Sequence, residues 1–206
     1  MRASSLLLLA APLAAVAAPA ASFGSSLKQA FDLFASTAQP AIECGEGYTK
    51  GSVTNVAEFP VSIKKITPVI NEFFTAEWEG FTVTNTTGKN NHPGALRSFS
   101  FGGIVPLTEE LTWYIQTGAF VDRLWKGVGG KYAGDLPVVS DVFDIELESW
   151  TEHFTLTPLC ENKATHFTWT AYYCSTNDAV AEQLYTGAHS GPYAALHDQF
   201  GNFTSC

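Results

Sequence analysis

Beyond Gly88, apolar and polar residues alternate along much of the chain as far as Tyr173, and a period of two residues is typical of β-strands that bury one face. Residues 165–173 form the clearest run, and residues 151–159 alternate with the opposite parity. Paired as an antiparallel hairpin, the two strands place their apolar side chains on one shared face. The register that follows from a loop at residues 161–164 sets Leu156 opposite Trp169 and Phe154 opposite Ala171.

A second hairpin is predicted from residues 95–101 and 105–116, which flank a glycine-rich turn suited to positive φ. If the turn is centred on Gly103, Arg97 pairs with Glu109 on the face that carries Phe99, Phe101, Leu107, Leu111 and Trp113. A half-residue shift instead pairs Arg97 with Glu110 and turns Leu111 and Trp113 away. Turn residues alone do not fix a register, so both remain open. We predict the first register, in which the buried charges of Arg97 and Glu109 are tolerated because they lie beside each other.

Helical patterns flank these strands. Residues 45–59 read as a first extended segment, and from Pro60 apolar residues recur at helical spacing as far as Phe74. Because Pro68 interrupts that pattern, we predict two short helices or one helix kinked at the proline. Residues 179–200 read as a carboxy-terminal helix interrupted by Gly187, Gly191 and Pro192.

The amino terminus has the three regions of a cleavable export signal: a positive charge at Arg2, an apolar run from Leu6, and small residues before Ser22. The run is short of the roughly 20 apolar residues that a spanning helix needs and contains two prolines. We therefore predict a signal peptide over residues 1–21, a helical leader over residues 22–44, and one folded domain over residues 45–206 of a secreted, extracellular protein.

Net charge narrows the choice of partners. Lys and Arg total 11 against 20 Asp and Glu, which gives a formal net charge of −9. Such a surface repels phosphate backbones and anionic lipid headgroups, and the chain has no basic cluster that overrides the average. We expect no nucleic-acid partner and no integral association with a membrane.

Cysteine use fits an exported protein, because thiols oxidise in that compartment. Two disulfides are expected among Cys44, Cys160, Cys174 and Cys206. In the predicted hairpin, Cys160 and Cys174 lie at opposite ends, about 30 Å apart at roughly 3.3 Å per residue, which disfavours a bridge between them. Two pairings stay open: Cys44–Cys174 with Cys160–Cys206, or Cys44–Cys160 with Cys174–Cys206. The Cys and His spacings predict no metal site.

Two sequons begin at Asn85 and Asn202 and predict surface glycans if the host is a eukaryote.

The order of these elements carries a family resemblance. An extended segment ends at Phe59-Pro60, two short helices follow, and one strand opens with Pro93-Gly94-Ala95-Leu96-Arg97 while the next contains Thr108-Glu109-Glu110-Leu111. With the last helix, this order resembles the START-like superfamily of Bet v 1, lipid-transfer and polyketide cyclase proteins, over about residues 45–202. The resemblance implies an α+β helix-grip fold, in which a curved antiparallel β-sheet wraps around the carboxy-terminal helix and two short helices follow the first strand.

The resemblance also implies a cavity between sheet and helix for a sterol, lipid or polyketide-like molecule, bound without a cofactor. The chain's 15 Phe, 7 Tyr and 5 Trp suit such a lining. The candidate ligand contacts are Arg97, Phe99, Phe101, Glu109, Leu111, Trp113, Phe154, Phe167 and Trp169.

Two alternatives to a binding protein remain. One is a cyclase-like or dehydratase-like enzyme in which Arg97 polarises a carbonyl and Glu109 or a nearby tyrosine moves a proton. The other is a secreted recognition protein whose aromatic residues fill a solid core. The five histidines form no recognisable nucleophile and base arrangement, so binding is the favoured prediction.

Overall fold

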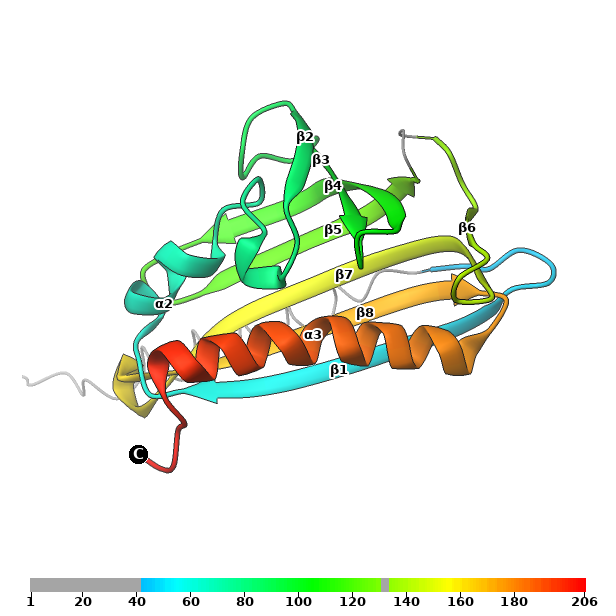
Figure 1. The fold of residues 1–206 in the computed structure, drawn as a ribbon. Helices are drawn as coiled ribbons and strands as arrows, with labels where there is room; N and C mark the ends of the chain where they lie inside the picture. Colours follow the sequence, from blue (N-terminus) through cyan, green and yellow to red (C-terminus); the bar gives the residue numbers. More distant parts are fainter. Residues whose placement is uncertain (1–41, 131–133) are drawn as a thin grey trace, which may run out of the picture. The chain divides into compact units, whose positions relative to one another are not determined.

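Antiparallel strand pairing organises the part of the chain described by this computed structural model, residues 42–130 and 134–206. The strands form one sheet in the order β1-β8-β7-β5-β4-β3-β2, and β6 pairs with one end of β7. The sheet curves around the long helix α3, which contacts β1, β8 and the short helix η1 (Figure 1). This is the predicted α+β helix-grip fold. The elements are β1 (Thr49–Phe59), α2 (Ile63–Ile70), η1 (Glu77–Glu79), β2 (Val83–Thr87), β3 (Leu96–Phe101), β4 (Val105–Gln116), β5 (Val121–Gly129), β6 (Val138–Ser140), β7 (Ile145–Leu159), η2 (Cys160–Asn162), β8 (Ala164–Ser175) and α3 (Asp178–Phe200).

The β3–β4 hairpin has the register predicted from a turn centred on Gly103. Phe101 lies opposite Val105 and Arg97 lies opposite Glu109. Gly102 and Gly103 both have positive φ, of 58° and 74°, which residues with a Cβ rarely adopt. The turn chemistry therefore selects the register that places the Arg97–Glu109 pair on the buried face.

The β7–β8 hairpin shares the predicted buried face but not the predicted register. Phe154 lies opposite Trp169 and Leu156 lies opposite Phe167, a shift of two residues. The shift arises in the loop, where the three residues of η2 all have φ between 52° and 65°. Because the shift is even, every side chain keeps its face.

Trp113 does not share the face of Leu111, and that prediction is wrong. The register between β4 and β5 shifts between these two residues, so that one extra residue on β4 reverses the alternation. The side chain of Thr112, within this bulge, donates to the carbonyl of Leu124 at 3.0 Å. Leu111 is consequently fully buried, whereas Trp113 is 44% exposed.

Prolines and glycines interrupt the helices less than the sequence predicts. Helix α2 continues through Pro68 and ends at Ile70 instead of splitting at the proline. Helix α3 is continuous over 23 residues and contains Pro192. Its inner side buries Ala181, His189, Pro192, Tyr193 and Leu196, and this burial outweighs the weak helix propensity of single glycines and of a proline.

Two disulfides confirm the predicted use of the cysteines and select the first of the two open pairings. Cys44 bonds to Cys174 and Cys160 bonds to Cys206, with Cα–Cα distances of 5.4 and 5.3 Å. The first ties the segment before β1 to the end of β8. The second ties the β7–β8 loop to the segment after α3, so the bridges lie at opposite ends of β8.

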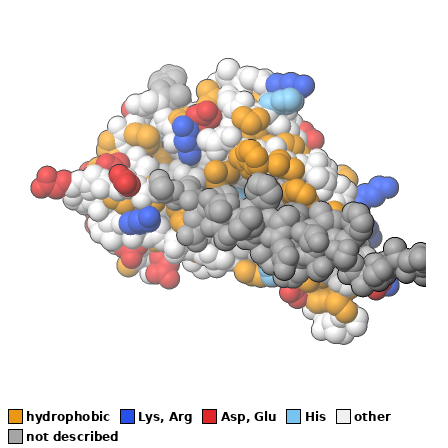
Figure 2. All heavy atoms as spheres, turned by 180° about the vertical axis from the view of Figure 1, so that it is seen from behind, with side chains coloured by type: hydrophobic (Ala, Val, Ile, Leu, Met, Phe, Trp, Pro, Cys, Tyr) orange, Lys and Arg blue, Asp and Glu red, His pale blue; other side chains and the backbone are white. Residues whose placement is uncertain are grey.

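Asn85 and Asn202 both lie exposed, as glycan acceptors must, and their modification stays a prediction. Among the described residues, no helix is long and apolar enough to cross a membrane. The predicted signal peptide and most of the predicted leader lie outside the described residues. On the face seen in Figure 2, Lys and Arg side chains stand apart from one another instead of forming a patch.

Removing the disulfides should destabilise the fold by amounts that follow their loop lengths. The bridges span sequence separations of 130 and 46 residues. Replacing Cys44 and Cys174 by alanine should lower the free energy of unfolding by about 5 kcal/mol, and replacing Cys160 and Cys206 by about 4 kcal/mol. Cys174 is also fully buried, which favours the same order. Urea unfolding of both double variants measures these losses, and a larger loss for the second pair would contradict this account.

Candidate functional site

A cavity of about 70 Å³, partly open to solvent, lies between the sheet and the amino-terminal half of α3. Its walls are mostly apolar and come from three places. They are Phe99, Phe101, Val105 and Leu107 on β3 and β4; Val138, Phe143, Ile145 and Leu147 around β6 and β7; and Leu184, Tyr185 and Ala188 on α3. A second group of lining residues is buried and largely polar. We call it the floor: Glu79, Glu109, Trp150, Glu152, Trp169 and His189.

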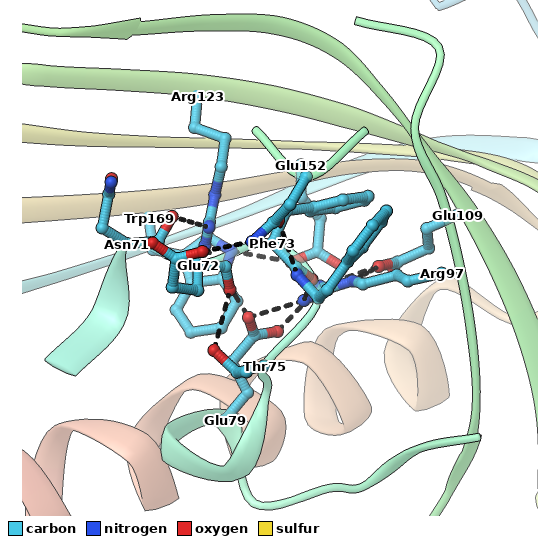
Figure 3. A network of polar contacts seen from close by, with 12 residues as sticks. Asn71, Glu72, Phe73, Thr75, Glu79, Arg97, Glu109, Arg123, Glu152 and Trp169 are labelled. Atoms are coloured by element: carbon cyan, nitrogen blue, oxygen red, sulfur yellow. Dashed lines mark hydrogen bonds and ion pairs between the residues drawn. The ribbon is translucent and has the colours of Figure 1, made fainter. Parts of the chain in front are cut away.

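Arg97 anchors the floor from behind (Figure 3). Its Nη1 and Nη2 each lie 2.8 Å from a different carboxylate oxygen of Glu79. Its Nε donates to Oε2 of Glu109, also at 2.8 Å, and Nη2 lies at the same distance from that oxygen. All three side chains are at most 2% exposed. The guanidinium therefore joins η1, β3 and β4 through charge-assisted bonds shielded from water.

Burial and charge act in opposite directions on these groups. Burial disfavours the charged guanidinium of Arg97, but the carboxylates of Glu79 and Glu109 raise its pKa above the ordinary value. Burial raises the pKa of Glu109 to about 7, against the attraction of Arg97, and the neighbouring carboxylates of Glu152 and Glu79 add to the rise. Burial therefore favours the protonated form of Glu109 more than in an exposed glutamate.

A second buried arginine, Arg123, stands beside this network. Its Nη2 lies 3.7 Å from Oε1 of Glu79, and its Nη1 donates to the backbone carbonyl of Asn71 at 3.3 Å. The guanidinium carbon lies 4.1 Å from the ring centre of Phe154. Burial, joined by the charge of Arg97 and opposed by the attraction of Glu79, lowers the pKa of Arg123 to about 9. The group stays protonated at neutral pH.

A glycine positions Trp150 against Glu109. A Cβ at Gly127 would lie 2.2 Å from the indole, so only glycine lets this ring lie flat over β5. From there the indole Nε1 donates to Oε1 of Glu109 at 3.2 Å. Both oxygens of Glu109 are therefore held, one by Arg97 and one by Trp150.

Glu152 and His189 form the other half of the floor. Nε1 of Trp169 donates to Oε2 of Glu152 at 2.7 Å, and Nε2 of His189 lies 3.2 Å from the same oxygen. The imidazole stacks on the indole with ring centres 4.0 Å apart, and its Nδ1 lies 2.9 Å from Oδ1 of Asn55. Both ring nitrogens therefore face oxygen atoms. An imidazolium would donate a hydrogen bond to each of them, and a neutral ring would donate to Asn55 and accept from a protonated Glu152.

The structure brings together four of the nine candidate ligand contacts. Phe99, Phe101, Glu109 and Trp169 line the cavity, whereas the other five do not. Arg97 lies behind the carboxylates, Trp113 is exposed, and Leu111, Phe154 and Phe167 pack in the core around Trp125.

Several lining residues were not candidates from sequence. Glu152 and Trp150 lie on the same face of β7 as the buried Phe154. A charged residue at such an inward-facing position could have been recognised from the sequence. Tyr185 and His189 stand four residues apart on α3 and thus on one side of the helix. Glu79 lies in a short 3₁₀ turn with no periodic pattern, and nothing in the sequence marks it as a partner of Arg97.

Comparisons with known proteins show the fold. No protein-family model and no curated protein matches the sequence. Among solved structures, a protein from Nitrosospira multiformis has a TM-score of 0.56 at 17% identity, covering 73% of this chain and 96% of its own. XoxI from Bacillus cereus has a TM-score of 0.54 at 14% identity, covering 73% and 95%. Ara h 8.0201 has a TM-score of 0.49 at 12% identity, covering 74% of this chain and 98% of its own. At such identities the likeness extends to the fold alone.

Removing Arg97, the cation behind the floor, should destabilise the protein strongly. Arg97→Met leaves two buried carboxylates without their main partner and should lower the free energy of unfolding by about 3–5 kcal/mol. Adding Glu109→Leu should recover only part of this loss, because Glu79 then keeps only Arg123, at 3.7 Å.

The matched control is Lys126→Met on the neighbouring β5. Lys126 pairs with Glu110 at 3.3 Å and is 48% exposed, so its loss should lower the free energy of unfolding by less than about 1 kcal/mol. Chemical unfolding measures all three variants. An Arg97→Met variant no less stable than Lys126→Met would show that the floor ion pairs contribute little.

Proposed function

We propose that this protein is a secreted binding protein that holds a small, largely apolar molecule in the cavity between sheet and α3. The observation that carries the proposal is the cavity itself. Its lining has the character of a small-molecule site, because apolar and aromatic walls surround a few convergent polar groups. A solid core, which a pure recognition protein would need, has no such space.

Export rests on two separate observations. The signal sequence predicts it, and the two disulfides support an oxidising compartment. They also lend stability to a domain that leaves part of its interior open.

A second candidate function is acid–base catalysis on the bound molecule. It is favoured by the convergence of titratable groups on the floor, where Glu109 has a pKa near 7 and His189 contacts Glu152. Arg97 does not line the cavity and its donors already meet carboxylates, so the hypothesis that Arg97 polarises a substrate carbonyl lacks support. An enzyme on this site would use Glu109, Glu152 or His189.

Filling the cavity should prevent uptake of an apolar probe. Ala188→Phe places a ring in the cavity from α3 and should weaken binding of neutral N-phenyl-1-naphthylamine, followed by fluorescence, by about tenfold or more. Ala194→Phe is the matched control, because Ala194 is exposed on the same helix and does not line the cavity. Circular dichroism and thermal unfolding verify that both variants fold. Unchanged uptake by a folded Ala188→Phe variant would refute binding at this site.

A further inference from the structure

The floor presents negatively charged groups to the cavity and keeps its positive groups behind them. Glu79, Glu109 and Glu152 line the cavity, whereas Arg97 and Arg123 do not. Within the described residues, Oε1 of Glu152 receives no hydrogen bond, while its Oε2 accepts from Trp169 and contacts His189. A ligand that reaches the floor therefore meets carboxylate oxygens with acceptor capacity to spare.

The charges of the floor balance only with the help of an exchangeable proton. Three carboxylates lie beside two arginines, which leaves a formal excess of one negative charge, and Glu109 is the carboxylate whose protonated form burial favours. Burial and the neighbouring carboxylates already raise the pKa of Glu109 to about 7, which shows how readily a proton occupies this site. A cationic group could neutralise the same charge in place of that proton.

The walls favour the same class of ligand. The rings of Trp150, Trp169 and Tyr185 border the carboxylates and make this end of the cavity aromatic as well as acidic. Away from the floor the lining is apolar except for Ser140 and the hydroxyl of Tyr185, so most of the rest of the ligand must be apolar as well.

An independent observation points to an occupant. Ser140 on β6 lines the cavity and is only 7% exposed, yet its Oγ has no hydrogen-bond partner among the described residues. Buried hydroxyls are normally paired, so this one marks a place where a bound molecule would supply the partner.

We propose that the cavity binds an amphiphilic amine, whose ammonium group takes the place of a proton at Glu109 and Glu152 and whose apolar body lies along the walls. The proposal rests on the proposed function and names its ligand class. Binding is an exchange: the ammonium enters, one proton leaves the floor to solvent, and the charge of the floor is unchanged.

The experiment compares three probes of equal chain length, decylamine, 1-decanol and decanoate, by isothermal titration below their aggregation concentrations. Decylamine should bind about tenfold or more tightly than decanol, and decanoate most weakly, because one ion pair worth 1.4 kcal/mol changes the dissociation constant tenfold. In Glu152→Gln the ratio of the two dissociation constants should fall toward one. In Glu146→Gln, on the same strand and outside the cavity lining, the ratio should stay as in the unaltered protein.

A pH series gives a second measurement that needs no variant. Glu109 interacts with Arg97 on β3, Glu79 on η1, Trp150 and Glu152 on β7 and Tyr185 on α3, and His189 on α3 lines the same cavity. Because burial raises the pKa of Glu109 to about 7, this carboxyl group loses its proton between about pH 6 and 8. Decylamine affinity should therefore rise with pH, by up to about tenfold per unit for one released proton, while decanol affinity stays level.

The outcomes separate the two proposals. Equal binding of decylamine and decanol, or a decylamine affinity that does not rise with pH, would overturn the amine ligand and leave the apolar-ligand function standing. Binding of none of the three probes, together with no uptake of N-phenyl-1-naphthylamine, would overturn both.

Discussion

The burial of Arg97 between two carboxylates is the constraint on which the rest of the site depends. An ion without water is tolerated only where partners satisfy it on several sides, and Glu79 and Glu109 do so from two different elements. This requirement fixes the position of η1 against the β3–β4 hairpin. It also orients Glu109 so that its second oxygen meets Trp150 of β7, over the surface that Gly127 leaves free.

An ionic floor also explains how the cavity can stay open. Apolar side chains normally collapse into empty space, because a void forfeits their packing contacts. Here the inner end of the space is bounded by carboxylates, and Oε1 of Glu152 accepts no hydrogen bond from the described residues, so an apolar side chain packed against it would leave this oxygen unpaired. The walls therefore cannot close on the floor without a desolvation penalty. Space above a buried charge is the feature that would turn this aromatic core into the proposed binding site.

Sequence patterns predicted the features that depend on period and turn chemistry. Alternation gave the buried face of β7 and β8, and glycine at Gly103 gave the register that buries Arg97 with Glu109. The predictions were wrong where the local backbone geometry changes at residues whose types do not indicate the change. The bulge at Thr112 turned Trp113 outward, and the left-handed backbone of η2 moved its hairpin by two residues. Glu79 was missed for another reason, since a long-range ionic contact from an irregular turn has no period.

The placement of the disulfides separates a fixed part of the structure from the part through which a ligand would enter. Both bridges attach at the ends of β8, and one also holds the segment that follows α3. The walls built from the β3–β4 hairpin and from β6 carry no cross-link among the described residues. Because local opening requires the least free energy where cross-links and buried contacts are fewest, ligand entry should involve these walls and not the β1–β8 side. The charged floor, held by contacts from η1, β3, β4 and β7, can then remain assembled while the mouth opens.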